Sequence, residues 1–94
     1  MSGKLKKNER VRVVLHRPIC KVSAADGSFS NVEENFFGYV QRTVPMPAGP
    51  ILLIRDDGGN LFALDCRDVT SGAAELEIHR DDGVYTTLVG ATDD

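Results

Sequence analysis

The sequence predicts a single, mainly β domain built from five to seven short antiparallel strands. Short runs of β-branched and aromatic residues are separated by glycine, proline, asparagine and aspartate, the pattern of strands joined by turns. Several runs alternate apolar and polar residues, so each of these strands would bury one face. A length of 94 residues fits one domain, and the absence of Trp leaves aliphatic side chains to form most of a modest core.

The first expected strand covers residues 10–16, where Val11, Val13 and Leu15 point to one face and Arg12, Val14 and His16 to the other. Pro18 cannot donate a hydrogen bond to a neighbouring strand. Residues 19–23 are therefore either a bent continuation of the first strand or a second, edge strand. Residues 25–28, with the sequence ADGS, form a turn.

The next strand is expected at residues 35–44, which are rich in aromatic and β-branched side chains. Gly38 within this pattern marks a bulge, a sharp bend or a place where another backbone comes close. Residues 45–50 contain three prolines and a glycine, so they form a stiff connector or an exposed loop.

Two hairpins follow this loop. Residues 51–56 and 60–66 are apolar runs on either side of a DGG turn. Residues 75–80 and 84–89 repeat the arrangement around a DDG turn. Between the two hairpins, residues 67–74 can hold one short helical turn.

The segment FFGYVQRTVPMPAGPILLIRDDGGNLFALDCRDVTS resembles the bent-strand and hairpin pattern of SH3-like and Sm-like small barrels. In this resemblance Gly38 matches the bend in a long strand, and Asp68 and Val69 match the short turn before the last strand. The resemblance implies a small β-barrel. RNA binding is not implied, because the sequence lacks the Asp or Asn of the Sm uridine pocket and the Arg-Gly pair of the last Sm strand.

The charges divide the chain unevenly. Residues 1–21 carry seven cationic side chains and one acid, whereas the remainder carries four arginines and thirteen acids. We expect residues 1–9 to be a mobile basic N-terminal arm, residues 10–90 the β-barrel domain and residues 91–94 an acidic tail. The asymmetry favours an arm that contacts an acidic partner or folds back on its own acidic body.

Several classes of function lack support in the sequence. No apolar run reaches the roughly 18 residues of a membrane span and no leader pattern is present, so we expect a cytoplasmic protein without a membrane partner. No nucleotide-binding or hydrolase motif occurs, so neither catalytic residues nor a cofactor are expected. Cys20, Cys66 and the two histidines lack the spacing of a metal site, and buried free thiols are the favoured state of both cysteines.

The candidate binding residues fall into a basic group and an aromatic group. The basic group would neutralise phosphates, or would only improve solubility as a solvated tail. In the aromatic group, neighbouring residues of a strand face opposite sides, so one of two adjacent phenylalanines is exposed unless the strand is packed on both faces. The candidates are Lys4, Lys6, Lys7, Arg10, Arg12, Phe36, Phe37 and Tyr39.

The favoured hypothesis is a non-enzymatic adaptor domain that binds another protein or a second copy of itself. Docking would use an edge strand or the proline-rich loop at residues 45–50. The alternative is an RNA- or DNA-binding regulator whose basic residues contact phosphates and whose aromatic rings stack on bases. The formal net charge of −3 favours the protein partner, because the acidic remainder of the chain repels nucleic acid.

Overall fold

The computed structural model describes residues 5–22, 26–89 and 92–93 of the chain. It confirms the predicted class, because the described residues form a mainly β structure with one short helix. The strands are β1 (Leu5–Lys6), β2 (Arg10–Leu15), β3 (Ile19–Val22), β4 (Phe29–Val32), β5 (Phe36–Val44), β6 (Ile51–Arg55), β7 (Leu61–Asp65), β8 (Ala74–Arg80), β9 (Gly83–Thr87) and β10 (Thr92–Asp93), and the helix is α1 (Cys66–Thr70).

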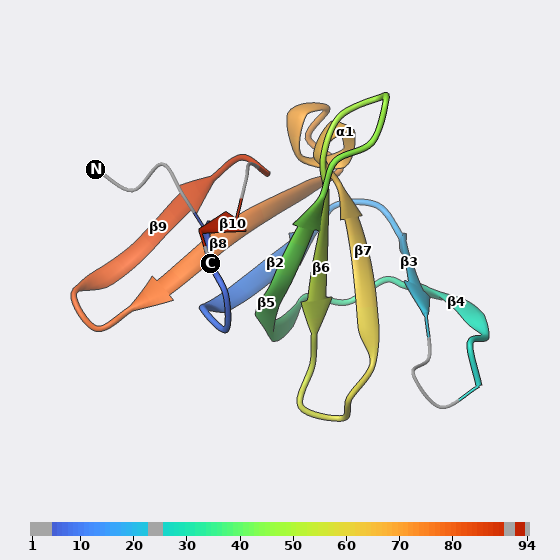
Figure 1. Cartoon of the computed structure of the whole chain (residues 1–94), viewed down its shortest axis with the longest axis horizontal. Coiled ribbons are helices and arrows are strands. Elements are labelled where there is room, and N and C mark those ends of the chain that lie inside the picture. Colours follow the sequence, from blue (N-terminus) through green and yellow to red (C-terminus); the bar gives the residue numbers. More distant parts are fainter. Residues whose placement is uncertain (1–4, 23–25, 90–91, 94) are drawn as a thin grey trace.

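Eight of these strands form one sheet in the order β4-β3-β7-β6-β5-β2-β8-β9. Its β6–β7 and β8–β9 pairs are the two hairpins that the sequence predicted. Figure 1 shows that the sheet is strongly twisted and that β4 and β9 lie at opposite ends of it. No pairing among the described residues joins these two edge strands, so closure of the sheet into a barrel stays a prediction.

The long strand β5 bends and pairs with a different neighbour along each half. Its N-terminal half pairs with β2 and its C-terminal half with β6. Gly38 lies where β6 comes close, since a Cβ atom at this position would be 2.5 Å from the Ile54 Cγ2 atom. The register with β6 then shifts between Val40 and Arg42, which is the signature of a bulge. The Arg55 carbonyl oxygen would be 3.0 Å from the same Cβ, so of the three alternatives that the sequence left open at Gly38, the close approach of another backbone is present in the structure.

Alternation along the strands directs one set of side chains into a single core. In β2, Val11 and Val13 are fully buried, whereas Arg10 and Arg12 lie on the opposite face. Within the described part of the chain no polar or charged residue is buried, so the core is apolar throughout. The core cluster comprises Leu5, Val11, Val13, Ile19, Val40, Leu52, Ile54, Phe62, Leu64, Ala74, Leu76, Ile78 and Val89.

The described part of the N-terminal segment packs on the domain, whereas the sequence suggested a mobile arm over residues 1–9. Leu5 is only 1% exposed and belongs to the core cluster. Asn8 has a φ of 67°, which turns the chain so that its backbone N–H donates to the Val40 carbonyl oxygen at 2.7 Å. β1 also pairs in parallel with β10, so part of the expected C-terminal tail is hydrogen-bonded as well.

An ion pair fastens the same segment to β8. The Arg80 Nε atom donates to Glu9 Oε2 at 2.7 Å, and the Glu9 side chain is only 8% exposed. Burial disfavours the charged form of Glu9, but hydrogen bonds from Arg80 and from the backbone N–H of Lys6 outweigh it, so the pKa of Glu9 lies below its ordinary value. The segment is thus held by the buried Leu5 side chain and by the ion pair between Glu9 and Arg80.

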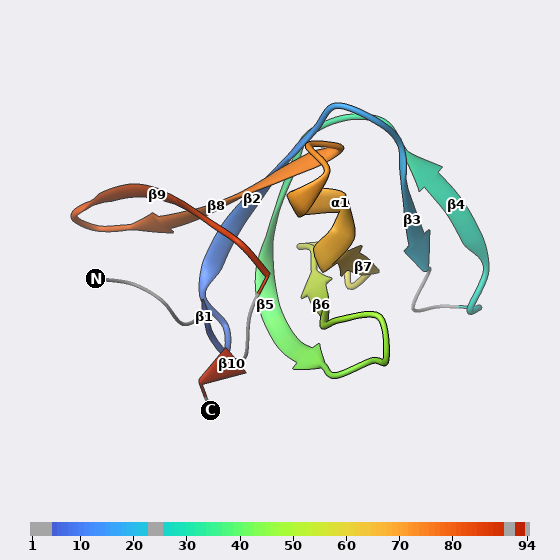
Figure 2. The same ribbon diagram turned by 90° about the horizontal axis from the view of Figure 1, so that it is seen from above.

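The helix α1 lies between the two hairpins, where the sequence allowed a helical turn. Figure 2 shows it within the curve of the sheet. Its N-cap is Asp65, whose carboxylate accepts hydrogen bonds from the Arg67 guanidinium at 2.8 Å and from the Arg67 backbone N–H at 2.9 Å. These bonds lower the pKa of Asp65 to about 2. None of the helices in the described residues is long and apolar enough to cross a bilayer.

Replacing Asp65 with alanine is expected to lower the free energy of unfolding by about 1 kcal/mol at neutral pH, because α1 loses its cap. The ordinary pKa of the carboxyl is 3.8, so its contribution is complete above about pH 4 and disappears as the pH falls toward 2. Urea unfolding at pH 7 and pH 2.5 measures both effects. Asp65→Asn, which keeps a capping side chain, is the matched control, and an equal loss at both pH values would contradict this role of the charge.

Candidate functional site

Four of the residues singled out in the sequence lie together on the outer face of β2 and β5. Arg10 is directly opposite Tyr39 in the ladder, and Arg12 is directly opposite Phe37. Opposite residues of neighbouring strands share a face of the sheet, and these four point away from the core. We call this group, Arg10, Arg12, Phe37 and Tyr39, the arginine–aromatic face.

The guanidinium groups of this face pack on the aromatic rings. The Arg10 Cζ atom is 4.7 Å from the centroid of the Tyr39 ring and 5.0 Å from that of Phe37. Arg12 approaches the other side of the group, with its Cζ atom 5.8 Å from the Phe37 centroid. The His79 ring meets Phe37 edge-on at 5.1 Å. Each cation–π contact at an exposed site contributes about 0.5–1 kcal/mol, so together they favour the observed orientation of Phe37.

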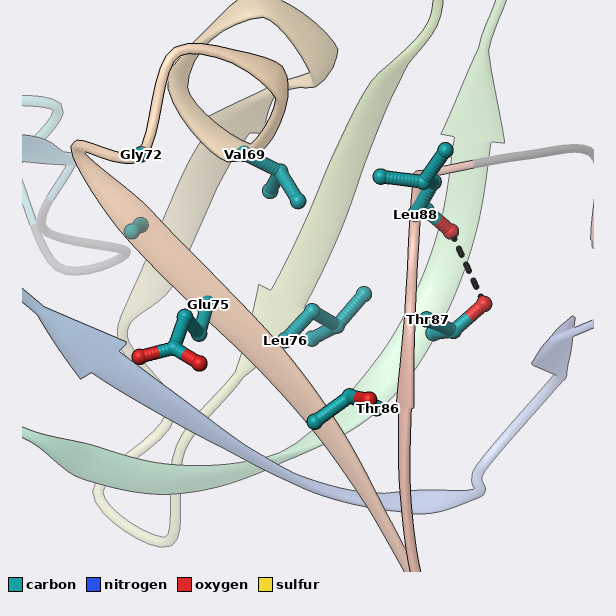
Figure 3. A pocket seen from close by; sticks show the side chains of 8 residues that line it. Val69, Gly72, Glu75, Leu76, Thr86, Thr87 and Leu88 are labelled. Atoms are coloured by element: carbon teal, nitrogen blue, oxygen red, sulfur yellow. Dashed lines mark hydrogen bonds between the residues drawn. The ribbon is translucent and has the colours of Figure 1, made fainter.

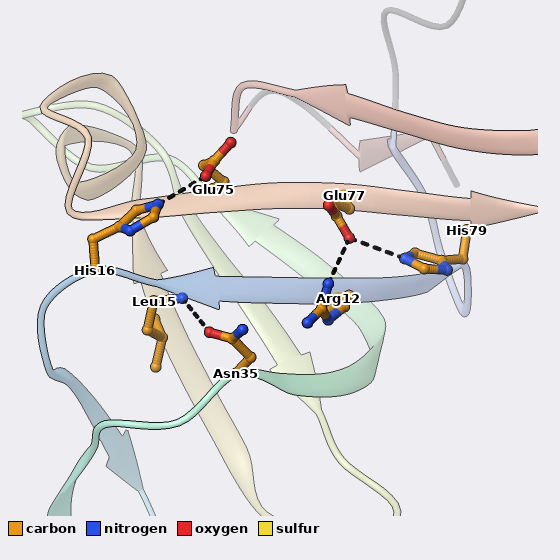
Figure 4. Close-up of polar contacts among 7 residues, drawn as sticks. All are labelled: Arg12, Leu15, His16, Asn35, Glu75, Glu77 and His79. Carbon is orange, nitrogen blue, oxygen red and sulfur yellow. Dashed lines mark hydrogen bonds and ion pairs between the residues drawn. The ribbon is translucent and has the colours of Figure 1, made fainter.

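Carboxylates lie at both ends of the arginine–aromatic face. Asp57 is 3.5 Å from the Arg10 guanidinium, and Glu77 is 3.5 Å from that of Arg12. Glu77 also contacts the His79 ring nitrogen at 3.2 Å, as Figure 4 shows. Long ion pairs between partly exposed groups contribute little to stability. Both arginines can therefore leave these carboxylates and contact the carboxylates of a partner instead.

The two adjacent phenylalanines have different environments. The Phe36 ring stacks on Phe62 with the centroids 4.0 Å apart and packs against the core. Phe37 is 42% exposed on the opposite face. Of this pair, only Phe37 is available to a partner, and Phe36 stabilises the sheet beneath it.

The lysines of the predicted basic group lie apart from these rings. Lys4 is outside the described residues. Lys6 and Lys7 are exposed, in β1 and in the turn that follows it. Neither lysine takes part in the ring contacts found within residues 5–22 and 26–89. The basic stretch therefore divides into exposed lysines in the N-terminal segment and arginines that belong to the sheet.

A small pocket adjoins the arginine–aromatic face. Its lining includes Arg55, which the sequence did not single out as a binding residue. It has a volume of about 230 Å³ and lies between Tyr39, Arg55 and the β6–β7 turn, where Asp56, Asp57 and Gly59 complete its lining. The Asp56 carboxylate accepts hydrogen bonds from the backbone N–H groups of Gly58 and Asn60, both at 2.9 Å, which fixes the shape of the turn. We call this the Tyr39 pocket.

A second, larger pocket of about 300 Å³ lies between α1 and the β8–β9 hairpin. Figure 3 shows Val69, Leu76 and Leu88 around it. Leu88 is 65% exposed, so this pocket is largely apolar and open to solvent. Its lining contains none of the candidate residues from the sequence. No local sequence pattern predicts this pocket, because α1 and the β8–β9 hairpin come together only in the folded chain.

The remaining reactive side chains are engaged in pairs or partly buried. Glu75 contacts the His16 ring nitrogen at 2.7 Å (Figure 4). Cys66 is a free, half-buried thiol whose Sγ atom lies 4.0 Å from the Ala48 carbonyl oxygen. Among the described residues, no three His, Cys, Asp or Glu side chains are grouped so that they could hold a metal ion. The side chain of Cys20 is outside the described part.

Comparisons with known proteins give one partial likeness. No protein-family model matches the chain, and no solved structure matches it. A stretch of 55 residues, 58% of the chain, is 40% identical to the phosphatidylinositol mannoside acyltransferase of Mycolicibacterium smegmatis. The matched stretch corresponds to 17% of that enzyme's length. The likeness is therefore to a small segment of the acyltransferase.

Proposed function

We propose that this chain is a small, non-enzymatic adaptor domain that binds another protein through the arginine–aromatic face. The exposed Phe37 ring, held between Arg10, Arg12 and His79, is the observation that carries the proposal. Aromatic and arginine side chains are enriched at the centres of protein interfaces. A ring that its neighbours already hold in place loses little conformational entropy when a partner covers it.

We propose further that the fold is an SH3-like or Sm-like small barrel, as the sequence resemblance implies. The strands β7-β6-β5-β2-β8 are neighbours in that order, so the last of these five strands along the chain pairs with the first. The bent β5 and the helical turn before β8 support the same proposal. Side chains carried on strands of such a sheet are positioned more firmly than side chains on a loop, which suits a docking surface.

Nucleic-acid binding is the alternative that the same residues allow. Arg10 and Arg12 would contact phosphates, and Phe37 and Tyr39 would stack on bases. The carboxylates of Asp57 and Glu77, together with the acidic character of the chain, oppose a polyanion at this surface, so the protein partner is favoured.

A role in acyl transfer is a second alternative, suggested by the name of the partly similar M. smegmatis protein. Its support is narrow because the matched stretch is only 17% of that enzyme. In this chain, moreover, each histidine is bonded to a glutamate, and the Cys66 thiol is half-buried. Among the described residues, neither histidine is hydrogen-bonded to a serine, threonine or cysteine, so no nucleophile is paired with an imidazole base there.

Replacing Phe37 with serine is expected to weaken binding of the partner protein by about 30-fold or more, the effect of removing the central residue of an interface. The tagged full chain would be used to capture proteins from its native host, with the captured proteins quantified by mass spectrometry. Phe29→Ser is the matched control, because Phe29 is 75% exposed on the distant edge strand β4.

A set of proteins lost with Phe37→Ser and kept with Phe29→Ser would support docking at this face. Equal retention by both variants would refute it. A gel shift of single-stranded RNA or DNA at low salt that disappears with Phe37→Ser would favour the nucleic-acid alternative instead.

A further inference from the structure

The hairpin of β8 and β9 ends the sheet with an unpaired strand edge. β9 pairs with β8 on one side, and none of the described strands pairs with it on the other. Figure 1 shows this hairpin extending away from the rest of the sheet. Every second residue of such a strand directs its backbone N–H and C=O groups outward. The edge of β9 can therefore accept one more strand.

The same strand exposes apolar side chains on both faces of the sheet. Val84 is 55% exposed and is opposite His79, on the outer face. Tyr85 is 36% exposed and is opposite Ile78, whose side chain lies in the core, so it is on the inner face. Leu88, directly after β9, is 65% exposed. A strand added beside β9 would cover these side chains from both sides of the sheet.

The larger pocket lies at the C-terminal end of this edge. The β8–β9 ladder ends at the pair of Leu76 and Thr87, and β8 extends beyond that pair to Ala74. The pocket of about 300 Å³ lies here, between Val69 of α1 and Leu88 (Figure 3). Alternate side chains of an added strand would point to this inner side of the sheet. The volume is at the lower limit of whole small-molecule sites, about 300–1,000 Å³, and leaves room for an apolar side chain.

Carboxylates lie at both ends of the β9 edge. Asp81 and Asp82 are exposed in the turn before β9, and Glu75 is the charged residue among those that line the pocket. Among the described residues, none of these three acids has an arginine or lysine as its ion-pair partner. Arg80, next to the turn, is already bonded to Glu9. Positive charge at the two ends of an incoming strand is therefore favoured, and negative charge is opposed.

We propose that β9 receives an extended segment of a partner protein as an additional strand. An apolar side chain of that segment occupies the pocket, and a lysine or arginine lies at each of its ends. Main-chain hydrogen bonds give such pairings affinity, and pockets for alternate side chains give them specificity. β9 is selected over β4, the other edge strand, because β4 lines neither of the two pockets described above. This edge lies outside the arginine–aromatic face, so the inference goes beyond the proposed function.

Titration of the ¹⁵N-labelled full chain with peptides, followed by NMR, tests this proposal. The probe is acetyl-Lys-Val-Thr-Leu-Thr-Val-Lys-amide, and the comparison peptide carries glutamate in place of both lysines. The lysine peptide should shift the backbone amide signals of Val84, Thr86 and Leu88, and the glutamate peptide should shift them far less. Unchanged β9 signals with the lysine peptide would overturn the proposal, as would β9 signals that depend on the protein concentration alone and so assign the edge to a second copy.

Two N-methylated forms of the lysine peptide test for strand pairing. One is methylated on the amides of its valines and leucine and the other on those of its threonines, so each lacks the hydrogen-bond donors of one edge. The form that lacks the donors facing β9 should bind about tenfold more weakly than the parent peptide, the effect of losing about two hydrogen bonds. Equal binding of all three peptides would mean docking through side chains alone and would reject strand addition.

Replacing Leu88 with serine should weaken binding of the lysine peptide about tenfold, because the pocket loses an apolar wall. Phe29→Ser is the matched control, since Phe29 is 75% exposed on β4 at the opposite edge of the sheet. The same loss with both variants would contradict binding at the pocket.

Replacing Asp81 and Asp82 together with asparagine should weaken binding of the lysine peptide about threefold, the effect of losing exposed charge pairs. The control variant replaces Glu33 and Glu34 with glutamine, which removes the same charge from exposed positions after β4. If both double variants bind equally weakly, the attraction is diffuse and the selection of a basic segment is wrong.

Discussion

Replacing Leu5 with alanine is expected to lower the free energy of unfolding by about 2–5 kcal/mol, although this residue lies in a basic stretch near the N-terminus. Leu5 is 1% exposed and packs within the core cluster, so its truncation leaves a cavity. Denaturant unfolding followed by circular dichroism measures the change. Lys7→Ala is the matched control, because Lys7 is exposed two residues away and its loss should change stability by less than about 0.5 kcal/mol.

Similar stabilities of Leu5→Ala and the control would mean that the N-terminal segment is an arm after all. A large difference would instead establish it as part of the cooperative unit. In that case a shortened chain that begins at residue 10 would lose both the Leu5 side chain and the ion pair of Glu9 with Arg80. Binding measured on such a shortened chain would then report a destabilised domain.

Replacing Gly38 with alanine is expected to destabilise the chain by about 1–3 kcal/mol through overpacking. The added Cβ would lie 2.5 Å from Ile54 Cγ2 and 3.0 Å from the Arg55 carbonyl oxygen, distances that require the β5–β6 ladder to move apart. Gly58→Ala is the matched control, since a Cβ there meets nothing closer than 3.4 Å. Thermal and denaturant unfolding of both variants measure the difference.

A double substitution tests the cause of that loss. Ile54→Ala removes the methyl group that a Cβ at position 38 would strike, so the cost of the pair should be less than the sum of the two single costs. Additive costs would mean that the backbone of Arg55, and not the Ile54 side chain, is the obstacle to a Cβ atom at position 38. Because Arg55 follows Ile54 directly, Gly38→Ala should also disturb the Tyr39 pocket.

Alternation and turn residues were sufficient to predict most of the sheet. The strands β2, β5, β6, β7, β8 and β9 and the turn at α1 lie where the sequence placed them. The strand β4 was not predicted because its exposed residues, including Ser30 and Asn31, show no apolar alternation. The pairing of β1 with β10 was not predicted because each strand is two residues long and the two strands lie far apart in the sequence. Local periodicity carries no information about such distant contacts.

The candidate site was likewise predicted only in part from the sequence. Alternation explains why Arg10, Arg12, Phe37 and Tyr39 share a face, since each is next to a buried residue or a glycine of its strand. It does not reveal which residues of β6 and β8 lie beside them, because that depends on the register between strands. Arg55 and His79 were missed for this reason.

The acidic residues of the edge hairpins affect how the molecule behaves at high concentration. β4 and β9 each pair on one side only among the described strands, so they present backbone donors and acceptors to other chains. Glu33 and Glu34 follow β4, and Asp81 and Asp82 precede β9, in a chain that is already anionic. Two copies that met edge to edge would bring these like charges together. Electrostatic repulsion between these like charges thus opposes edge-to-edge association of two copies.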